Sequence, residues 1–185
     1  LLDYSQKLID VAQTNASQNG YSINFIQSDA RNMDLPGGVF DHVIIMGNSL
    51  GYIQSTGADS EIIREGYRIL RPGGWLLVDV TDGNVVKNAF KPDSWHEIGE
   101  RTVICRRREL RGNLINAREL VMDKLDGLIR DQTYAIRLYD SESLDLLLQQ
   151  TGFRKIKIST NFSPHSSDGD YGFMNSRMIG VGQKT

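Results

Sequence analysis

The most informative stretch of this sequence runs from Arg68 to Val80 and reads RILRPGGWLLVDV. Pro72 has no backbone N–H and disfavours the helical conformation at the preceding residue, so a helix that arrives here must end. Gly73 and Gly74 can adopt the positive φ angles that a tight reversal needs. The apolar run from Trp75 to Val78 is typical of a strand covered on both faces in a parallel sheet. The stretch therefore predicts a helix, a turn and a buried strand in immediate succession.

Strand-like and helix-like patterns alternate on the N-terminal side of this stretch. Residues 1–2 are interpreted as the end of a strand, and residues 23–27 and 40–46 are predicted as strands, the last one buried. Residues 5–19 and 59–70 are predicted as helices with one apolar face. This alternation predicts a doubly wound, mostly parallel α/β sheet that binds its ligand at the carboxyl ends of the strands.

The pattern changes in the second half of the chain. Three segments between residues 100 and 138 alternate polar and apolar side chains and are separated by turn residues, which predicts an antiparallel meander. A helix follows at residues 141–150, then closing strands at 154–160 and 177–181 around a polar surface loop at 161–175. We therefore expect three parts: a core formed by residues 1–99, an inserted three-stranded antiparallel lid at 100–139, and a C-terminal helix with closing strands at 140–185.

Composition excludes several classes of protein. The 21 basic and 23 acidic side chains give a formal net charge of −2, which favours neither a nucleic-acid partner nor an anionic membrane. Cys105 is the sole cysteine, so a disulfide framework and a cysteine zinc site are excluded, and no ligand cluster suggests a metal. The sequence has no apolar run of about 18 residues and no signal peptide, so we expect a cytoplasmic protein. The arginines at 106–111 are interpreted as the outer face of a strand, with a phosphate site as the alternative.

Polar groups follow four of the predicted strands. Asp3 follows the first apolar pair and Asp29 follows the next strand, while Gly47-Asn48 and Asp79 come at the ends of the strands after it. Because the carboxyl ends of parallel strands meet at one edge of a sheet, we expect these groups to form a ligand site.

These segments resemble the class I S-adenosylmethionine (SAM)-dependent methyltransferases. LLDYSQKLIDVAQ resembles the second strand of that family with its helix, INFIQSDARNMDL the third strand, FDHVIIMGNSLGYI the fourth strand with its exit loop, and RILRPGGWLLVDV the helix, turn and fifth strand. The resemblance implies a Rossmann-like fold of the methyltransferase type and SAM as the cofactor.

The resemblance also implies roles for residues at the strand ends. Asp3 would accept hydrogen bonds from both ribose hydroxyls of SAM, with a helix cap as its structural alternative, and Tyr4 would flank the adenine ring. Asp29 would bind the adenine amino group, and the Ala30 N–H a ring nitrogen. The methionine part of SAM would lie against the exit loop, at Gly47, Asn48 and Ser49.

The sequence departs from the family pattern in one respect. Family members open with a strand that ends in a Gly-rich loop under SAM, and no Gly-x-Gly-x-x-Gly occurs in these 185 residues. That first strand, which lies between the second and the fourth in the family's sheet, is expected to be absent. The sheet would then contain a gap or close it by pairing its neighbours. Since the chain begins with Leu1 inside a strand, we expect a fragment that binds SAM weakly and has doubtful activity.

The acceptor side of the site is expected at His96, Tyr52, Tyr139 and Arg137. Packing of the lid is the alternative for His96, and pairing with Asp140 is the alternative for Arg137, which could otherwise bind a carboxylate or phosphate. The loop MGNSLGY differs from the Asp/Asn-Pro-Pro-aromatic loop of amino-methylating nucleic-acid enzymes. This difference favours methyl transfer to N or O of a small-molecule acceptor.

Two other functions remain open at the level of sequence. A nicotinamide-dependent oxidoreductase would also use Asp3 for a ribose, but the Pro72-Gly73-Gly74 turn and the lack of a Tyr-x-x-x-Lys pair count against it. A non-catalytic scaffold of methyltransferase type, which binds a partner through the lid, agrees with the missing Gly-rich loop.

Overall fold

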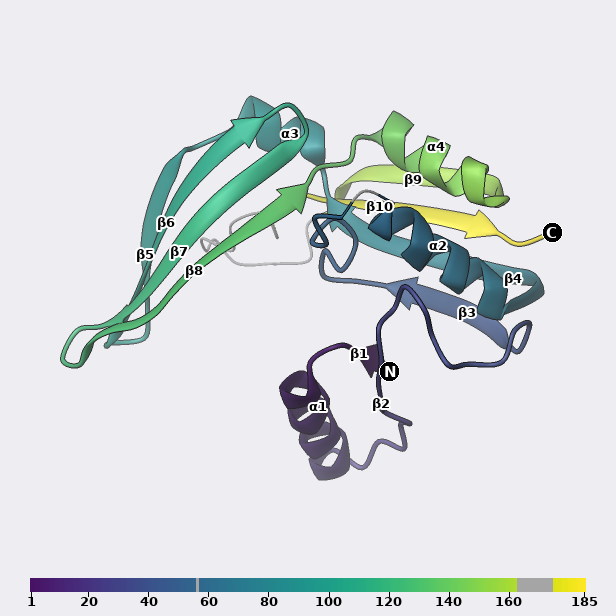
Figure 1. The fold of residues 1–185 in the computed structure, drawn as a ribbon, viewed down its shortest axis with the longest axis horizontal. Helices are drawn as coiled ribbons and strands as arrows, with labels where there is room; N and C mark the ends of the chain where they lie inside the picture. Colours follow the sequence, from purple (N-terminus) through teal and green to yellow (C-terminus); the bar gives the residue numbers. More distant parts are fainter. Residues whose placement is uncertain (56, 163–174) are drawn as a thin grey trace.

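The computed structural model describes residues 1–55, 57–162 and 175–185. Three assemblies of strands and helices make up the described chain (Figure 1). A small N-terminal unit has two paired strands and a helix, a four-stranded central sheet carries two helices, and a second four-stranded sheet extends away from the centre as a long arm. The surface loop predicted at 161–175 lies mostly outside the described residues.

The N-terminal unit is a short strand–helix–strand. Strand β1 (Leu2–Asp3) pairs in parallel with β2 (Ile26–Gln27), and helix α1 (Gln6–Gln18) connects them. The helix begins where the sequence predicts because Ser5 is its N-cap and accepts a hydrogen bond from the Leu8 N–H. The strand predicted at 23–27 is thus confirmed only at its last two residues.

The central sheet has the strand order β3-β4-β10-β9. Strands β3 and β4 are parallel, and β10 is antiparallel to both of its neighbours. Helices α2 and α4 contact each other over one face of this sheet. The strands of this sheet and its two helices have the bounds β3 (Phe40–Ile45), α2 (Ala58–Ile69), β4 (Leu70–Thr81), α4 (Ser141–Thr151), β9 (Arg154–Phe162) and β10 (Arg177–Gln183).

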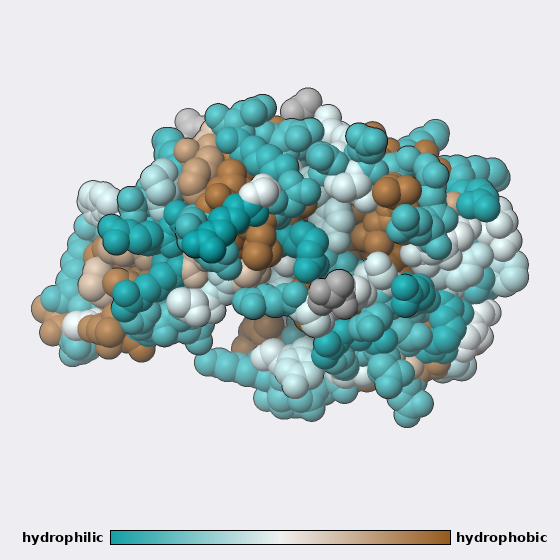
Figure 2. Space-filling model, turned by 45° about the horizontal axis from the view of Figure 1, so that its top comes forward, coloured by the Kyte–Doolittle hydropathy of each residue, from teal (hydrophilic) through white to brown (hydrophobic). Residues whose placement is uncertain are grey.

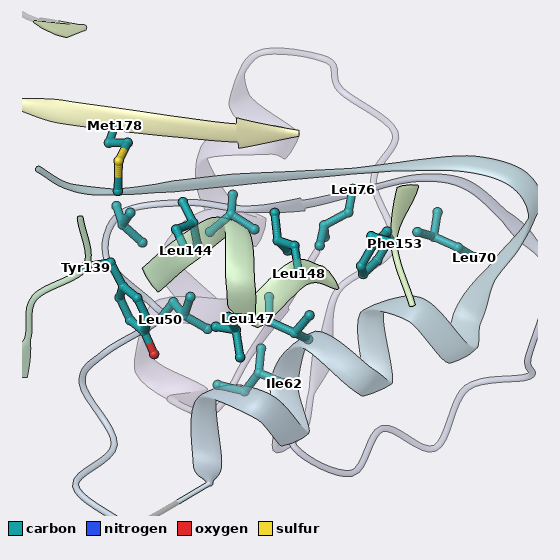
Figure 3. Close-up of a cluster of buried hydrophobic side chains, with 13 residues drawn as sticks. Leu50, Ile62, Leu70, Leu76, Tyr139, Leu144, Leu147, Leu148, Phe153 and Met178 are labelled. Carbon is teal, nitrogen blue, oxygen red and sulfur yellow. The ribbon is translucent and has the colours of Figure 1, made fainter. Parts of the chain in front are cut away.

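One apolar core lies between this sheet and its two helices (Figure 3). Alternate residues of β4 point into it, because successive side chains of a strand face opposite ways. The helices add apolar side chains at helical spacing, and Phe153 closes the end of the core. The buried members include Leu76, Val78, Val80, Ile62, Ile63, Leu144, Leu147, Leu148 and Met178.

The Pro72 turn lies inside β4. The pairing of β3 with β4 jumps from Phe40–Leu70 to His42–Trp75, so the residues between Leu70 and Trp75 bulge out of the ladder. Gly73 has φ +80° and its N–H donates to the carbonyl oxygen of Lys184 at 2.7 Å. The predicted end of the helix is confirmed. The strand begins at Leu70, five residues before the predicted Trp75, because Leu70 already pairs with Phe40 ahead of the bulge.

Strand β3 was predicted to be buried, and this expectation is wrong. Ile44 and, just after the strand, Met46 are 61% and 59% exposed. Val43 and Ile45 pack against the core beneath α2 and α4, so Ile44 points to the opposite face of the sheet. Among the described residues β3 pairs only with β4, and β1 only with β2. Within the described residues β1 and β3 thus lie in separate sheets and do not pair with each other.

The arm is an antiparallel sheet with the strand order β5-β6-β7-β8, which we call the lid. It has four strands where the sequence predicts three, because β5 precedes residue 100 and carries too few apolar residues to stand out. A short helix, α3, packs Val86 against Ile115 and Ile136 of the lid. The bounds are α3 (Gly83–Asn88), β5 (Asp93–Ile98), β6 (Thr102–Arg111), β7 (Leu114–Asp123) and β8 (Gly127–Arg137).

Within the described residues, none of the helices has the length and apolar character required to cross a membrane.

The bulge in β4 leaves no room for a side chain at Gly74. A Cβ there would lie 2.9 Å from the carbonyl oxygen of Asp41 and 3.0 Å from that of Arg71, which are backbone atoms. We expect Gly74→Ala to lower the free energy of unfolding by about 1–3 kcal/mol, measured by urea denaturation. Gly66→Ala in α2 is the matched control: its Cβ would meet Val43 at an ordinary 3.6 Å, so the gain in helix propensity should leave stability equal or higher. Equal effects of the two substitutions would contradict this account.

Candidate functional site

A buried polar cluster lies at the carboxyl ends of β3 and β4, and we call it the Arg177 cluster: Arg177, Asp79, Asn48 and Thr81. The Arg177 side chain is fully buried, and its Nε donates to Asp79 Oδ1 at 2.8 Å. Its Nη1 donates to Asn48 Oδ1 at 2.8 Å and to Thr81 Oγ1 at 3.1 Å. A buried guanidinium is tolerated only when it is paired and hydrogen-bonded in this way.

The Arg177 cluster sets the shape of the loop that leaves β3. Asp79 Oδ2 accepts from the Gly47 N–H at 3.2 Å, and Asn48 Oδ1 accepts from the Thr81 N–H at 2.7 Å. Gly47 has φ +68° and Asn48 φ +61°, the left-handed region that glycine and asparagine occupy most readily. The exit loop is therefore fixed by side chains from the next two strands of the sheet.

A second carboxylate joins the exit loop to the lid. Asp59 is buried at the start of α2, and its Oδ1 accepts from the Gly51 N–H at 2.9 Å. Its Oδ2 accepts from the Tyr139 hydroxyl at 2.6 Å and from Arg137 Nη1. Burial, followed by the bond to Asp59, raises the pKa of Tyr139, so the phenol keeps its proton. Arg137 thus pairs with Asp59 and not with Asp140, which was the predicted alternative.

Two aromatic rings connect the exit loop to the lid. Tyr52, half-exposed at the end of the loop, stacks on Tyr134 of β8 with 6.1 Å between ring centroids. Burial raises the pKa of Tyr52. The nearby Tyr134 and Glu119 raise this pKa further, and Arg106 lowers it. The face of the lid that carries Tyr134 is hereafter its inner face.

His96 lies on β5, and its Nδ1 is 3.5 Å from Arg106 Nη1. The alternation of side chains along β6 also divides the arginine run that was predicted to lie on the outer face. Arg106 and Arg108 share the inner face with His96, whereas Arg107 and Arg111 point outward. The outer-face expectation is therefore wrong for two of these four arginines.

The residues predicted to bind the adenosine part of SAM lie in and next to the N-terminal unit. Asp3 Oδ1 accepts from the Ser5 N–H at 2.8 Å, but the N-cap of α1 is Ser5, so the helix-cap alternative for Asp3 is wrong. Tyr4 is 77% exposed. The Arg31 guanidinium, 2.5 Å from Asp29, holds the pKa of that carboxyl below its usual range. Ala30 packs against the central core.

The structure brings together some of the expected strand ends. Gly47, Asn48 and Asp79 meet in one network, while the carbonyl of Asp3 accepts from the Ser28 N–H next to the end of β2. Ser49 is exposed, and its hydroxyl donates to the Met46 carbonyl at 2.8 Å. In the part of the chain that the structure describes, no group of His, Cys, Asp and Glu is suited to hold a metal ion.

Sequence reasoning missed Asp59 and the polar role of Thr81. An acidic residue in the first turn of a helix is a weak signal, because it is favourable there in any protein. The partners of Asp59 lie 78 and 80 residues further along the chain, and Arg177 lies 98 residues from Asp79. Only the folded arrangement reveals these pairs.

Comparison with known proteins agrees with this arrangement. Residues 1–74 match a family model described as a methyltransferase domain. The protein YqeM of Bacillus subtilis (strain 168), which is named as a methyltransferase, is 25% identical over 167 residues, covering 88% of this chain and 67% of YqeM.

Solved structures of similar fold include a SAM-dependent methyltransferase from Clostridium acetobutylicum, with a TM-score of 0.77 and 13% identity over 99% of this chain and 73% of that one. The CcbJ methyltransferase of Streptomyces caelestis has a TM-score of 0.75 and 15% identity over 100% and 73% of the two chains. SAM-bound CalS10, an amino pentose methyltransferase of Micromonospora echinaspora, has a TM-score of 0.62 and 17% identity over 100% and 72%. At these identities the matches show a methyltransferase-type α/β fold.

The Arg177 cluster makes a prediction about stability. Arg177→Met leaves the buried Asp79 carboxylate without its cation, and we expect the free energy of unfolding to fall by about 3–5 kcal/mol. Arg107→Met is the matched control, because Arg107 pairs with Asp93 in the open, with side chains 84% and 63% exposed, and should change stability little. Urea denaturation of both variants measures the difference. A loss in Arg177→Met no larger than in the control would contradict the central role of the cluster.

Proposed function

We propose that this chain serves methyl transfer to N or O of a small-molecule acceptor. The proposal starts from its lineage as a class I SAM-dependent methyltransferase, with SAM as the cofactor. The observation that carries this proposal is the exit loop Gly47–Gly51, which the Arg177 cluster fixes at its start and Asp59 at its end. The loop lies at the ligand-binding edge of the sheet and leads directly to Tyr52, which faces the lid.

The acceptor class is supported by the lid and by structural relatives. The lid meets the exit loop where Tyr134 stacks on Tyr52 and the Arg137 N–H donates to the Gly51 carbonyl, an arrangement that suits a small molecule bound between the two. Exclusion of water by such a molecule's surroundings would favour the transfer. Among the structures of similar fold are the amino pentose methyltransferase CalS10 and the sugar N-methyltransferase KedS8. A polyhydroxylated or amino-substituted small molecule is therefore the kind of acceptor that we propose.

SAM supplies a methyl group that its sulfonium charge already activates, so the residues of this chain bind, orient and exclude water. Gly47, Asn48 and Ser49 would hold the methionine part. Asp3 and Tyr4 would bind the ribose and flank the adenine. The Asp29 carboxylate, which is paired with Arg31, would have to accept a hydrogen bond from the adenine amino group as well. Ala30 would offer its backbone N–H to the adenine ring.

The acceptor side divides into two pairs. Tyr52 and His96, on the exit loop and the inner face of the lid, would contact the acceptor, and the imidazole of His96 would act as the general base. Tyr139 and Arg137 are positioning residues in this proposal, since both are bound by Asp59 and act through the exit loop.

The finer architecture is also part of the proposal: a core of residues 1–99, a lid of 100–139 whose sheet starts at β5, and a C-terminal part of 140–185. The family's first strand would fit between β1 and β3, where the edge of β3 is open. Its Gly-rich loop is not present in residues 1–185, so we expect this chain to bind SAM weakly.

Both the site and its weakness can be tested in one experiment. Titration of the 185-residue chain with SAM up to millimolar concentration, followed by backbone amide chemical shifts, should move the signals of Gly47, Asn48, Asp3 and Ala30 with affinity weaker than micromolar. Micromolar affinity would contradict the expected weakness. Absence of shifts at these residues would favour the non-catalytic scaffold. The edge of β3, which within the described residues is not covered by another strand, agrees with that second function.

A paired substitution tests the adenosine side. Tyr4→Ala removes the ring proposed to flank adenine, and loss of an aromatic platform of this kind should weaken SAM binding by roughly tenfold. Tyr21→Ala is the control, because Tyr21 is similarly exposed (67%, against 77% for Tyr4) but has no proposed contact with SAM. Equal affinities of the two variants for SAM would exclude the role of Tyr4.

A further inference from the structure

The lid has a different balance of charge on each of its two faces. On the outer face, arginines and carboxylates pair one to one: Arg107 with Asp93, and Arg118 with Asp131. The middle of the inner face, by contrast, carries three arginines and a single carboxylate in the strands that the structure describes: Arg106, Arg108, Arg130 and Glu119.

Asp123 shares the inner-face alternation but belongs to the far tip of the lid. It accepts from the turn N–H groups of Leu125 and Asp126 at 2.8 and 3.0 Å, and it pairs with Arg101 at 2.7 Å. These bonds hold its pKa at about 2, so it stays a bound carboxylate of the turn and does not balance the arginines in the middle of the face.

Glu119 alone cannot neutralise its two neighbours. Its Oε2 accepts from Arg106 Nε at 2.7 Å, and its Oε1 accepts from Arg130 Nη2 at 2.5 Å. Each guanidinium has five N–H donors and gives only one of them to this carboxylate. The pair therefore keeps one positive charge in excess, with donors left for a second oxyanion.

The two guanidinium groups differ in access. The Arg106 side chain is 17% exposed and that of Arg130 is 48% exposed, so one is anchored in the face and the other reaches solvent. Both lie on the face that carries Tyr134, and Arg106 acts on the pKa of Tyr52 from the acceptor side of the exit loop. Figure 2 shows a hollow beside the lid, at the lower left of the view.

We propose that Arg106 and Arg130 bind an oxyanion of the methyl acceptor, a carboxylate or a phosphate, on the inner face of the lid. This inference rests on the proposed methyltransferase function and narrows its acceptor to an anionic one. Planar guanidinium groups bind carboxylates and phosphates through parallel hydrogen bonds, which fixes the orientation of the bound molecule. Glu119 holds the two side chains in place and competes with the oxyanion for them.

The test uses simple anions and no SAM. The 185-residue chain is titrated with sodium phosphate and, separately, with sodium acetate at an ionic strength held constant with sodium chloride. Backbone amide shifts of Arg106, Glu119 and Arg130 should saturate with at least one anion, and the tighter one identifies the phosphate or the carboxylate class. Shifts that do not saturate, or that chloride reproduces, would overturn the proposal.

Three variants separate binding from a structural role. Arg130→Gln should weaken the anion by about tenfold, the loss expected for one charge-assisted contact. Glu119→Gln removes the competing carboxylate and should tighten binding several-fold. Arg107→Gln is the matched control, because Arg107 is adjacent in sequence but on the outer face, and its affinity should equal that of the unmodified chain. Arg130 is half-exposed, so an unchanged far-ultraviolet spectrum is expected and confirms that its variant is folded.

Two results would contradict the proposal: weaker binding in Glu119→Gln, which indicates that the carboxylate only supports the fold, or an equal loss in Arg107→Gln, which indicates unspecific attraction. Because no SAM is present, these outcomes are independent of the SAM titration. Anion binding that fails while SAM still shifts Gly47 and Asn48 would refute the anionic acceptor and leave the methyltransferase proposal intact.

Discussion

The buried pair between Arg177 and Asp79 is the interaction on which the rest of the site depends. A guanidinium without solvent must have its donors satisfied by fixed partners, and here they come from the end of β4 and from the exit loop of β3. The last strand of the chain therefore decides the backbone conformation of a loop about 130 residues earlier. Moving any one of these groups would break hydrogen bonds of a buried charge or amide, so the cluster favours the observed shape of the loop.

Asp59 extends this dependence to the lid. The exit loop is held at Gly47 by the Arg177 cluster and at Gly51 by Asp59, which also binds the segment that leaves β8. At Gly51 the backbone is so close to Arg137 that a Cβ would lie 2.6 Å from its carbonyl oxygen. The cofactor side and the acceptor side of the proposed site are thus connected by five consecutive residues, and a shift of the lid at this point has to move the loop with it.

The sequence predicts well whatever is decided by neighbours along the chain. The start of α1 at Ser5, the end of α2 before Pro72 and the end of α4 at Gly152 all follow from local capping and turn chemistry. It predicts poorly what depends on the surroundings of a strand: β3 has the composition of a buried strand, yet its exposure is set by which elements cover each of its two faces. The faces of Arg106 and Arg107 likewise depend on a register that only the paired strands define. For the same reason the strand-end residues were foreseen as a group, while their cation, Arg177, was not.

The open edge of β3 connects stability with the proposed function. An edge strand such as β3, which exposes Ile44 and within the described residues pairs on one side only, is a surface that proteins normally cover, since it invites pairing with other chains. A strand that paired there in parallel would end at the same edge of the sheet as β3, beside Gly47 and the Arg177 cluster. A loop leaving that strand would arrive at the position proposed for the methionine part of SAM. On the proposed architecture, the uncovered edge of β3 and the expected weakness of SAM binding have one cause, so a strand that covers this edge should raise both the stability of the sheet and the affinity for SAM.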